Sequence, residues 1–220
     1  MVDIFDEVAE DLRNERALAL ARRYGALIIA LCVLVLLGVA GQQVWAWTQG
    51  KQDAKAASAY IALTGPIDAA GPLTPAQTQA DAQSLTGFAA GAPEGYKTLS
   101  LLRAAGLYAD AGSLKQAEAL WNSVANDGGA DPLLRDLANL LWAQHAIGQA
   151  PDAEVLARLQ PLTADGNAYH GLAREAQALV YMREGQNGLA KSLLDQIAAD
   201  ADSPEGVRNR AEGLLAKLNG

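Results

Sequence analysis

The chain has 220 residues and a formal net charge of −8, with 25 acidic residues against 17 Lys and Arg. No Lys/Arg-rich stretch is present, which argues against a nucleic-acid-binding protein and against a domain that lies flat on anionic lipid. The single cysteine excludes an internal disulfide framework.

Residues 1–23 are predicted to form an amphipathic tail. Ile4, Val8 and Leu12 recur at helical spacing, with charged residues on the other faces. The tail is either a solvated helix that leads into the next segment or a docking helix for a cytoplasmic partner. Charged amphipathic helices are common and unspecific, so the pattern favours the solvated helix.

Residues 24–47 are predicted to form a transmembrane helix. The segment carries no charged residue and is mostly apolar, and a helix of about 20 such residues spans the hydrocarbon core of a bilayer. Tyr24 stands at one end and Trp45 and Trp47 at the other, where aromatic rings favour the membrane interfaces.

The orientation of the span follows from its flanking Lys and Arg residues. The N-terminal flank is richer in basic residues than the C-terminal flank, so we expect the N-terminus in the cytoplasm and the following domain on the far side. The basic residues are Arg13, Arg16, Arg22 and Arg23 before the span, and Lys51 and Lys55 after it.

A cleaved signal peptide is the alternative interpretation, since the small residues of Gly38-Val-Ala40 precede Gly41. The apolar region of a signal peptide has about 7–15 residues. Here the uncharged stretch continues to the tryptophans and follows a long acidic tail, which favours an uncleaved anchor. Cys32 is not a predicted lipidation site, because Leu31 is too large for a usual lipoprotein signal and the thiol lies mid-span.

The rest of the chain is predicted to be all-α, because it is rich in Ala and Leu and poor in β-branched and aromatic residues. Residues 48–73 form a predicted helical stalk with a Gly/Pro hinge, broken at Thr64-Gly-Pro66 and again at Ala70-Gly-Pro72. A helical repeat domain, 74–220, then begins at Thr74 with a capping box and a first-turn proline. The segment near 64–75 is the expected flexible hinge.

A repeated pattern is the most specific feature of this domain. Gly112, Gly148 and Gly185 each stand five residues before an alanine, with spacings of 36 and 37 residues. A period in this range with two helices per unit is typical of an α-solenoid. We also expect Ser113 with Gln116 to cap the helix that follows. Other expectations are an apolar stripe of Leu99, Leu102, Leu107 and Tyr108, an Asp131-Pro132 cap, a helix end at Pro161, and a last helix after Ser203-Pro204 that buries Val207 and Ala211.

The Gly–Ala spacing, the paired helices, and Tyr108 and Tyr181 resemble tetratricopeptide repeats. The middle unit departs from that family, with Leu141 where a small residue is favoured and Gln144 where Tyr is favoured. Pro161 also shortens its second helix. The resemblance therefore implies a tetratricopeptide-like solenoid with a degenerate middle repeat.

In tetratricopeptide repeats the first helix of each pair lines the concave face, so the resemblance implies a candidate peptide-binding groove here. A Trp and a Met among charged residues can bind peptides tolerantly. Helical spacing alone favours the alternative, in which Trp142 and Met182 are core residues. The candidate groove residues are Leu102, Arg135, Trp142, His145, Glu175, Met182 and Arg183.

The order of tail, span, alanine-rich helix and degenerate repeats resembles the ancillary SecYEG translocon subunit family of Gram-negative bacteria. The tail sequence Asp3-Ile-Phe-Asp-Glu-Val-Ala-Glu-Asp-Leu12, with Arg22-Arg-Tyr-Gly25, is similar to alphaproteobacterial members. The resemblance implies a single-pass protein of the bacterial inner membrane with a periplasmic domain. It implies the SecYEG translocon and a membrane-anchored periplasmic prolyl isomerase as partners, in the transfer of exported proteins to periplasmic chaperones, and no catalytic residues.

The sequence also predicts no enzyme, cofactor, metal or small-molecule substrate. His145 and His170 belong to different predicted helices, which gives no support for a zinc site. Neither a phosphate-binding Gly loop nor a nucleophile elbow is present. A generic envelope scaffold for division or cell-wall machinery is the alternative function. The acidic cluster of Asp195, Asp200, Asp202 and Glu205 does not have the spacing of an EF-hand and is predicted to be a solvated loop.

Overall fold

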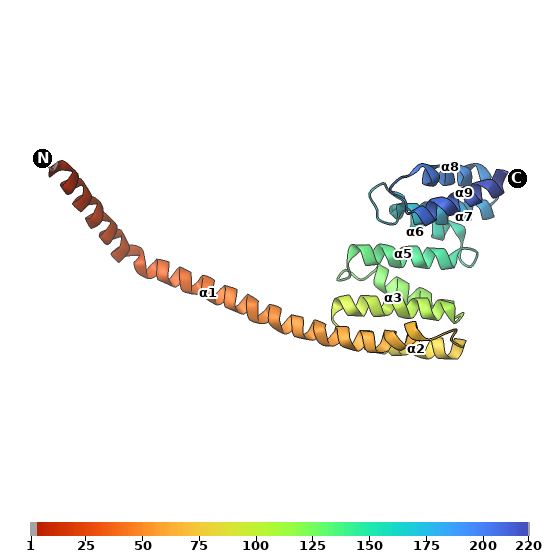
Figure 1. Cartoon of the computed structure of the whole chain (residues 1–220), viewed down its shortest axis with the longest axis horizontal. Helices are drawn as coiled ribbons and strands as arrows, with labels where there is room; N and C mark the ends of the chain where they lie inside the picture. The colour runs from red at the N-terminus through yellow and green to blue at the C-terminus, as the bar shows by residue number, and fades with distance from the viewer. Residues whose placement is uncertain (1–3, 220) are drawn as a thin grey trace. The chain divides into compact units, whose positions relative to one another are not determined.

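The computed structural model describes the backbone of residues 4–219 and the side chains from Arg23 to Asn219, apart from residues 26 and 28. Every secondary-structure element in this range is helical (Figure 1), which confirms the all-α prediction. The elements are α1 (Ile4–Ala69), α2 (Pro75–Ala89), α3 (Glu94–Asp110), α4 (Leu114–Ala125), α5 (Pro132–Ala146), α6 (Asp152–Leu159), the 3-10 turn η1 (Gln160–Thr163), α7 (His170–Arg183), α8 (Asn187–Ala199) and α9 (Glu205–Asn219).

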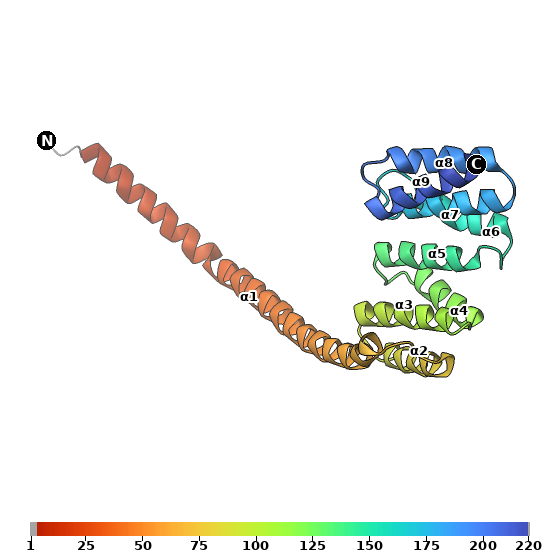
Figure 2. The same cartoon turned by 45° about the vertical axis from the view of Figure 1, so that its right-hand side comes forward.

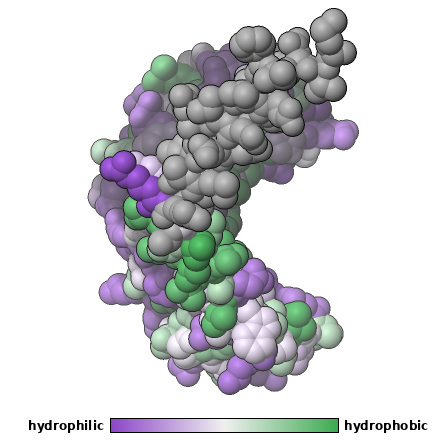
Figure 3. All heavy atoms as spheres, turned by 90° about the vertical axis from the view of Figure 1, so that its left-hand side faces the viewer, coloured by the Kyte–Doolittle hydropathy of each residue, from purple (hydrophilic) through white to green (hydrophobic). Residues whose placement is uncertain are grey.

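The chain divides into two compact units, one up to Ala54 and one from Lys55 onward. The part of α1 from Arg23 to Ala69 is long and apolar enough to cross a membrane, with a mean hydropathy of 2.6 over its most apolar window. Its large apolar side chains are exposed, Trp45 by 64%, and Figure 3 shows hydrophobic side chains gathered on the surface next to the grey residues. The side chains of the predicted tail up to Arg22 lie outside the described residues.

Cations mark both ends of the apolar segment. The Arg23 guanidinium lies 5.8 Å from the Tyr24 ring centroid, and the Lys51 ammonium lies 3.6 Å from the Trp47 ring centroid. Cation–π contacts of this kind suit residues at a membrane interface, where an aromatic ring and a charge share the polar boundary.

The predicted helix break at Thr64-Gly-Pro66 is wrong. Helix α1 continues through Pro66 to Ala69, although an internal proline removes one backbone hydrogen bond. Tertiary packing compensates, because Tyr60, Leu63 and Ile67 pack against the main hydrophobic core. The chain leaves the helical conformation only after Ala69, so the last turns of the predicted stalk belong to the packed unit.

The second unit is a stack of antiparallel helices in two layers. Each helix from α2 to α9 packs on the next one, and α3 also contacts α5, α5 contacts α7 and α7 contacts α9. The odd-numbered helices therefore form one layer and the even-numbered helices the other. Figures 1 and 2 both show α2, α3 and α5 stacked, with α7–α9 at the C-terminal end.

Two hydrophobic clusters fill this unit. The larger runs from Ala82 to Val180 and includes Trp121 and Trp142. The smaller holds the C-terminal helices together around Leu194 and Ile197. Val207 and Ala211 of α9 are buried in the smaller cluster, as predicted for the last helix.

The three predicted turn glycines have the left-handed conformation that favours glycine, with φ of 75° at Gly112, 79° at Gly148 and 74° at Gly185. Two of the turns share one hydrogen-bond pattern: Ser113 N–H donates to the Tyr108 carbonyl and Gln186 N–H to the Tyr181 carbonyl, each at 2.8 Å. These are six-to-one bonds of the Schellman type. At Gly148 the corresponding bond is replaced by Gln149 N–H and Ala150 N–H donating to the Ala146 carbonyl, so the degenerate middle repeat also turns differently.

The predicted caps have mixed outcomes. Thr74 with Gln77 forms the capping box of α2, and Asp131 caps α5 by accepting from Leu133 N–H. Ser113 makes no side-chain cap on α4, so that prediction is wrong. Its hydroxyl instead accepts a 2.6 Å bond from Gln79 Nε2, which joins α2 to the α3–α4 turn.

Two further predictions are settled by the helices themselves. Helix α6 ends at Leu159 and continues as a 3-10 turn that contains Pro161, as predicted. Leu99 is 39% exposed, so its assignment to the apolar stripe of α3 is wrong, whereas Leu102, Leu107 and Tyr108 are buried.

Candidate functional site

The seven predicted groove residues lie on α3, α5 and α7, which belong to one layer of the stack. Leu102, Trp142 and Glu175 are buried, with exposed fractions of 8%, 4% and 7%. Leu102 and Trp142 offer almost no surface to a bound peptide, whereas Glu175 borders an open depression between α7 and α9. The remaining members are half-buried or exposed at the surface of α5 and α7, and their role in peptide binding stays a prediction: Arg135, His145, Met182 and Arg183.

Trp142 is covered by a neighbouring helix. The Arg158 guanidinium of α6 lies 3.9 Å from the Trp142 ring centroid, and its Nη2 donates a 2.5 Å bond to Asn122 Oδ1 of α4. Burial lowers the pKa of Arg158, while Glu154 and Glu118 raise it. The indole face is therefore occupied inside the protein, as the core interpretation of Trp142 requires.

His145 also serves packing. Its ring lies 4.7 Å from the Trp121 ring, centroid to centroid, and its Nδ1 lies 2.8 Å from the Leu141 carbonyl oxygen. A carbonyl can only accept, so Nδ1 carries the proton. Trp121 is fully buried and was not among the predicted site residues.

The charged members on α7 form ion pairs with other helices. Glu175 accepts two bonds from Arg210 of α9, at 2.6 Å from Nε and 2.7 Å from Nη2, and this carboxylate raises the pKa of Arg210. Arg183 pairs with Asp152 of α6, which raises the pKa of Arg183. The Glu175–Arg210 pair is bidentate, the strong kind of Arg–carboxylate contact, and it links α7 to α9.

His170 and Asp200 form a second link between α7 and the α8–α9 turn. The imidazole Nε2 lies 2.6 Å from Asp200 Oδ2 and Nδ1 lies 2.7 Å from the Asn167 carbonyl oxygen. Both partners accept, so the ring bonds to both only as imidazolium. The Asn167 carbonyl and then Asp200 raise the pKa of His170, and His170 with Ser203 lowers the pKa of Asp200 to about 2.

This link accounts for one residue of the predicted acidic cluster. Asp200 is engaged by His170 and by the Ser203 hydroxyl. In the part of the chain with described side chains, no group of three or more His, Cys, Asp and Glu residues is placed to hold a metal ion.

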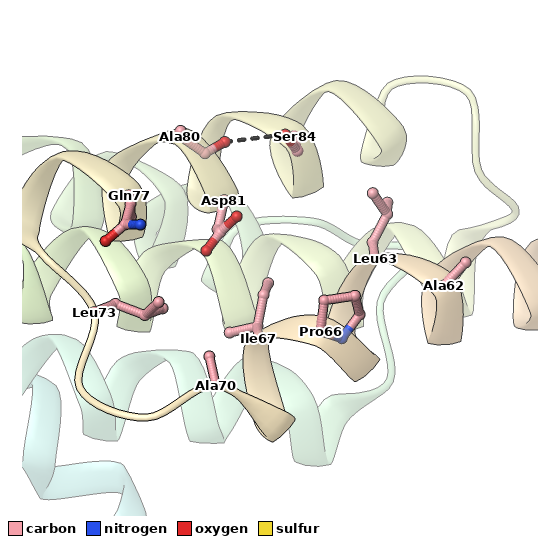
Figure 4. Close-up of a pocket in the computed structure, with 10 residues that line it drawn as sticks. All are labelled: Ala62, Leu63, Pro66, Ile67, Ala70, Leu73, Gln77, Ala80, Asp81 and Ser84. Carbon is pink, nitrogen blue, oxygen red and sulfur yellow. Dashed lines mark hydrogen bonds between the residues drawn. The ribbon is translucent and has the colours of Figure 1, made fainter.

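The open depressions on the surface of the repeat unit include the following three. The first, about 440 Å³, lies between the end of α1 and α2 (Figure 4). The second, about 600 Å³, surrounds the His170–Asp200 pair. The third, about 330 Å³, lies between α7 and α9 and includes Leu179 and the Glu175–Arg210 pair. Only the third contains a predicted groove residue. Sequence reasoning missed the first because it placed a flexible hinge there.

A family model described as a tetratricopeptide repeat-like domain matches residues 21–219, which include the apolar segment as well as every repeat. No curated protein matches the chain, and no solved structure matches it.

Proposed function

The chain belongs to the tetratricopeptide repeat-like family, and from that premise we propose that it is a membrane-anchored scaffold whose function is to bind other proteins. Stacked helical repeats present extended surfaces that suit protein partners. The observation that carries the proposal is that one helix, α1, contains both the exposed apolar segment and the first packed turns of the repeat unit.

A more specific proposal concerns the cellular location of the protein and the identity of its partners. The arginine bias before the span supports a cytoplasmic N-terminus and a periplasmic repeat domain. The order of segments and the tail sequence resemble the ancillary SecYEG translocon subunits. We therefore propose an inner-membrane protein beside the SecYEG translocon that works with a membrane-anchored periplasmic prolyl isomerase and passes exported proteins to chaperones. Tethering gives weak contacts a high effective concentration.

In-cell crosslinking tests the partner. A photoreactive residue is placed along 24–63, for instance at the exposed Ile61, and crosslinked proteins are identified by mass spectrometry. Subunits of SecYEG and a prolyl isomerase are expected. Abundant crosslinks to division or cell-wall proteins, with none to translocon subunits, would refute the translocon partner and favour a generic envelope scaffold.

Protease treatment of spheroplasts tests the orientation. The repeat domain should be digested while the N-terminal tail is protected. Survival of the repeat domain would show that the proposed orientation is wrong. A mature N-terminus at Gly41 would show that the apolar segment is a cleaved signal peptide and not an anchor.

A further inference from the structure

The first depression, which we name the α1–α2 groove, lies within the repeat unit on its first helical hairpin (Figure 4). Its apolar lining comes from Leu63, Pro66, Ile67 and Leu73, and its volume is about 440 Å³. This space can take one or two large side chains of a partner. The groove exists because α1 continues past Pro66 and folds back on α2 through the segment 70–74.

The groove is apolar except for a few polar groups, and its one ionisable lining residue is Asp81. Asp81 is half-buried, and among the described side chains it forms no hydrogen bond or ion pair. Figure 4 shows its carboxylate between α2 and Ile67. A carboxylate in such surroundings lacks part of its hydration, so a cation brought to it is favoured.

The other polar side chains of the lining are largely engaged within the protein. The oxygen of Gln77 accepts from Thr74 in the capping box, and the Ser84 hydroxyl donates to the Ala80 carbonyl. The groove therefore combines apolar walls with the Asp81 carboxylate, an acceptor that suits a cation with N–H donors.

We infer that the α1–α2 groove is a docking site for a partner-protein segment in which a large apolar side chain stands next to Lys or Arg. The apolar side chain fills the space beside Leu73 and Ile67, and the cation pairs with Asp81. An acidic segment would be repelled by Asp81. This inference rests on the proposed scaffold function and specifies the chemistry of one of its partners.

The site also fits a partner that works near the membrane. Ala62 follows Trp47 by only 15 residues of chain, so an anchored protein keeps this groove in reach of segments close to the membrane surface. The chain from Gln49 onward is acidic, with 19 acidic and 13 basic residues, which favours encounter with cationic segments.

Peptide binding to the full-length protein in nanodiscs of zwitterionic phosphatidylcholine tests the inference. Two fluorescent 12-residue probes share their Leu positions but carry either Lys or Glu between them. Fluorescence anisotropy should show the Lys probe binding about fivefold more tightly or better, with affinity that falls as salt rises. Empty nanodiscs measure binding to lipid alone.

Matched variants locate the binding. Asp81→Asn should lower the affinity for the Lys probe about fivefold and make that affinity less dependent on salt. Asp195→Asn, which changes an exposed aspartate of α8, should leave both unchanged. Leu73→Ala should lower the affinity for the Lys probe by a similar factor, because apolar contact is lost. Leu189→Ala, which changes an exposed leucine of α8, should leave the affinity unchanged. Leu73 lies in the loop between helices, so melting of this variant should match the wild type.

Equal binding of both probes, or equal affinity of Asp81→Asn and wild type, would overturn the inference. Dimerisation of the wild type that Asp81→Asn abolishes would also overturn it, by assigning the groove to a second copy. The groove inference and the translocon proposal can fail independently, and the two failures give different results. Crosslinks to translocon subunits without probe binding would refute the groove alone, and probe binding without such crosslinks would refute the translocon partner alone.

Discussion

Replacing Trp142 with alanine distinguishes a core residue from a peptide-binding residue. Trp142 is 4% exposed and belongs to the larger hydrophobic cluster. Truncation of a buried aromatic residue of this size costs about 3–5 kcal/mol. The contact with Arg158 would be lost as well, which adds to the cost. The indole Nε1 has no hydrogen-bond partner among the described residues, so the substitution breaks no hydrogen bond of this side chain.

Thermal unfolding of the full-length protein in detergent, followed by circular dichroism, measures the effect. For a unit of this size about 1 kcal/mol shifts the melting temperature by about 2–4 °C, so Trp142→Ala should lower it by about 6 °C or more. Trp142→Phe keeps an apolar ring, so its melting temperature should lie between those of Trp142→Ala and the wild type. Trp45→Ala is the matched control, because Trp45 lies in the exposed apolar segment.

The assignment of Trp142 to the core is wrong if Trp142→Ala lowers the free energy of unfolding by less than about 0.5 kcal/mol, the range of an ordinary surface substitution. If the same variant also lost crosslinks to its partners, Trp142 would be a groove residue and the packing described above would be wrong at this position.

Three further outcomes are expected. Ala117→Leu, at a fully buried site of α4, should destabilise by about 1–3 kcal/mol through overpacking in denaturant unfolding, whereas Ala119→Leu on the exposed face of α4 should not. Gly185→Ala should cost about 1 kcal/mol by the same measurement, because φ is 74° there; no loss would contradict the left-handed turn. The His170–Asp200 pair has a raised pKa on His170 and a pKa of about 2 on Asp200, so its stabilisation should be complete between about pH 4 and 6.5 and should decline as pH rises through the raised pKa. The difference in melting temperature between wild type and Asp200→Asn should therefore narrow at alkaline pH, and a difference that widens there would refute the imidazolium.

Local chemistry made several parts of the fold predictable from sequence. A left-handed turn needs a residue without a Cβ, which is why Gly112, Gly148 and Gly185 mark the helix pairs. Thr74 and Asp131 cap their helices because the side chain bonds a backbone N–H two or three residues away. Such bonds close within one turn of chain, so their geometry is present in the sequence spacing itself.

The candidate groove was predictable only in part. Register placed its residues on α3, α5 and α7, which do share one layer. Register cannot tell which residues of a helix that packs on several neighbours face another helix and which face solvent. Arg158, whose side chain covers Trp142, lies on the following helix α6, and Arg210, which pairs with Glu175, lies on α9, 35 residues away.

The sequence by itself determined the uncharged segment 24–47, the all-α class and the period of the repeats, because composition and spacing express local propensity and burial. Tertiary structure decided that α1 passes through Pro66, since the packing of Tyr60, Leu63 and Ile67 on the core outweighs one lost hydrogen bond. It also decided that the Ser113 hydroxyl bonds Gln79 and that Leu99 faces solvent. Each of these depends on which distant helix lies alongside, and that proximity arises only when the chain is packed.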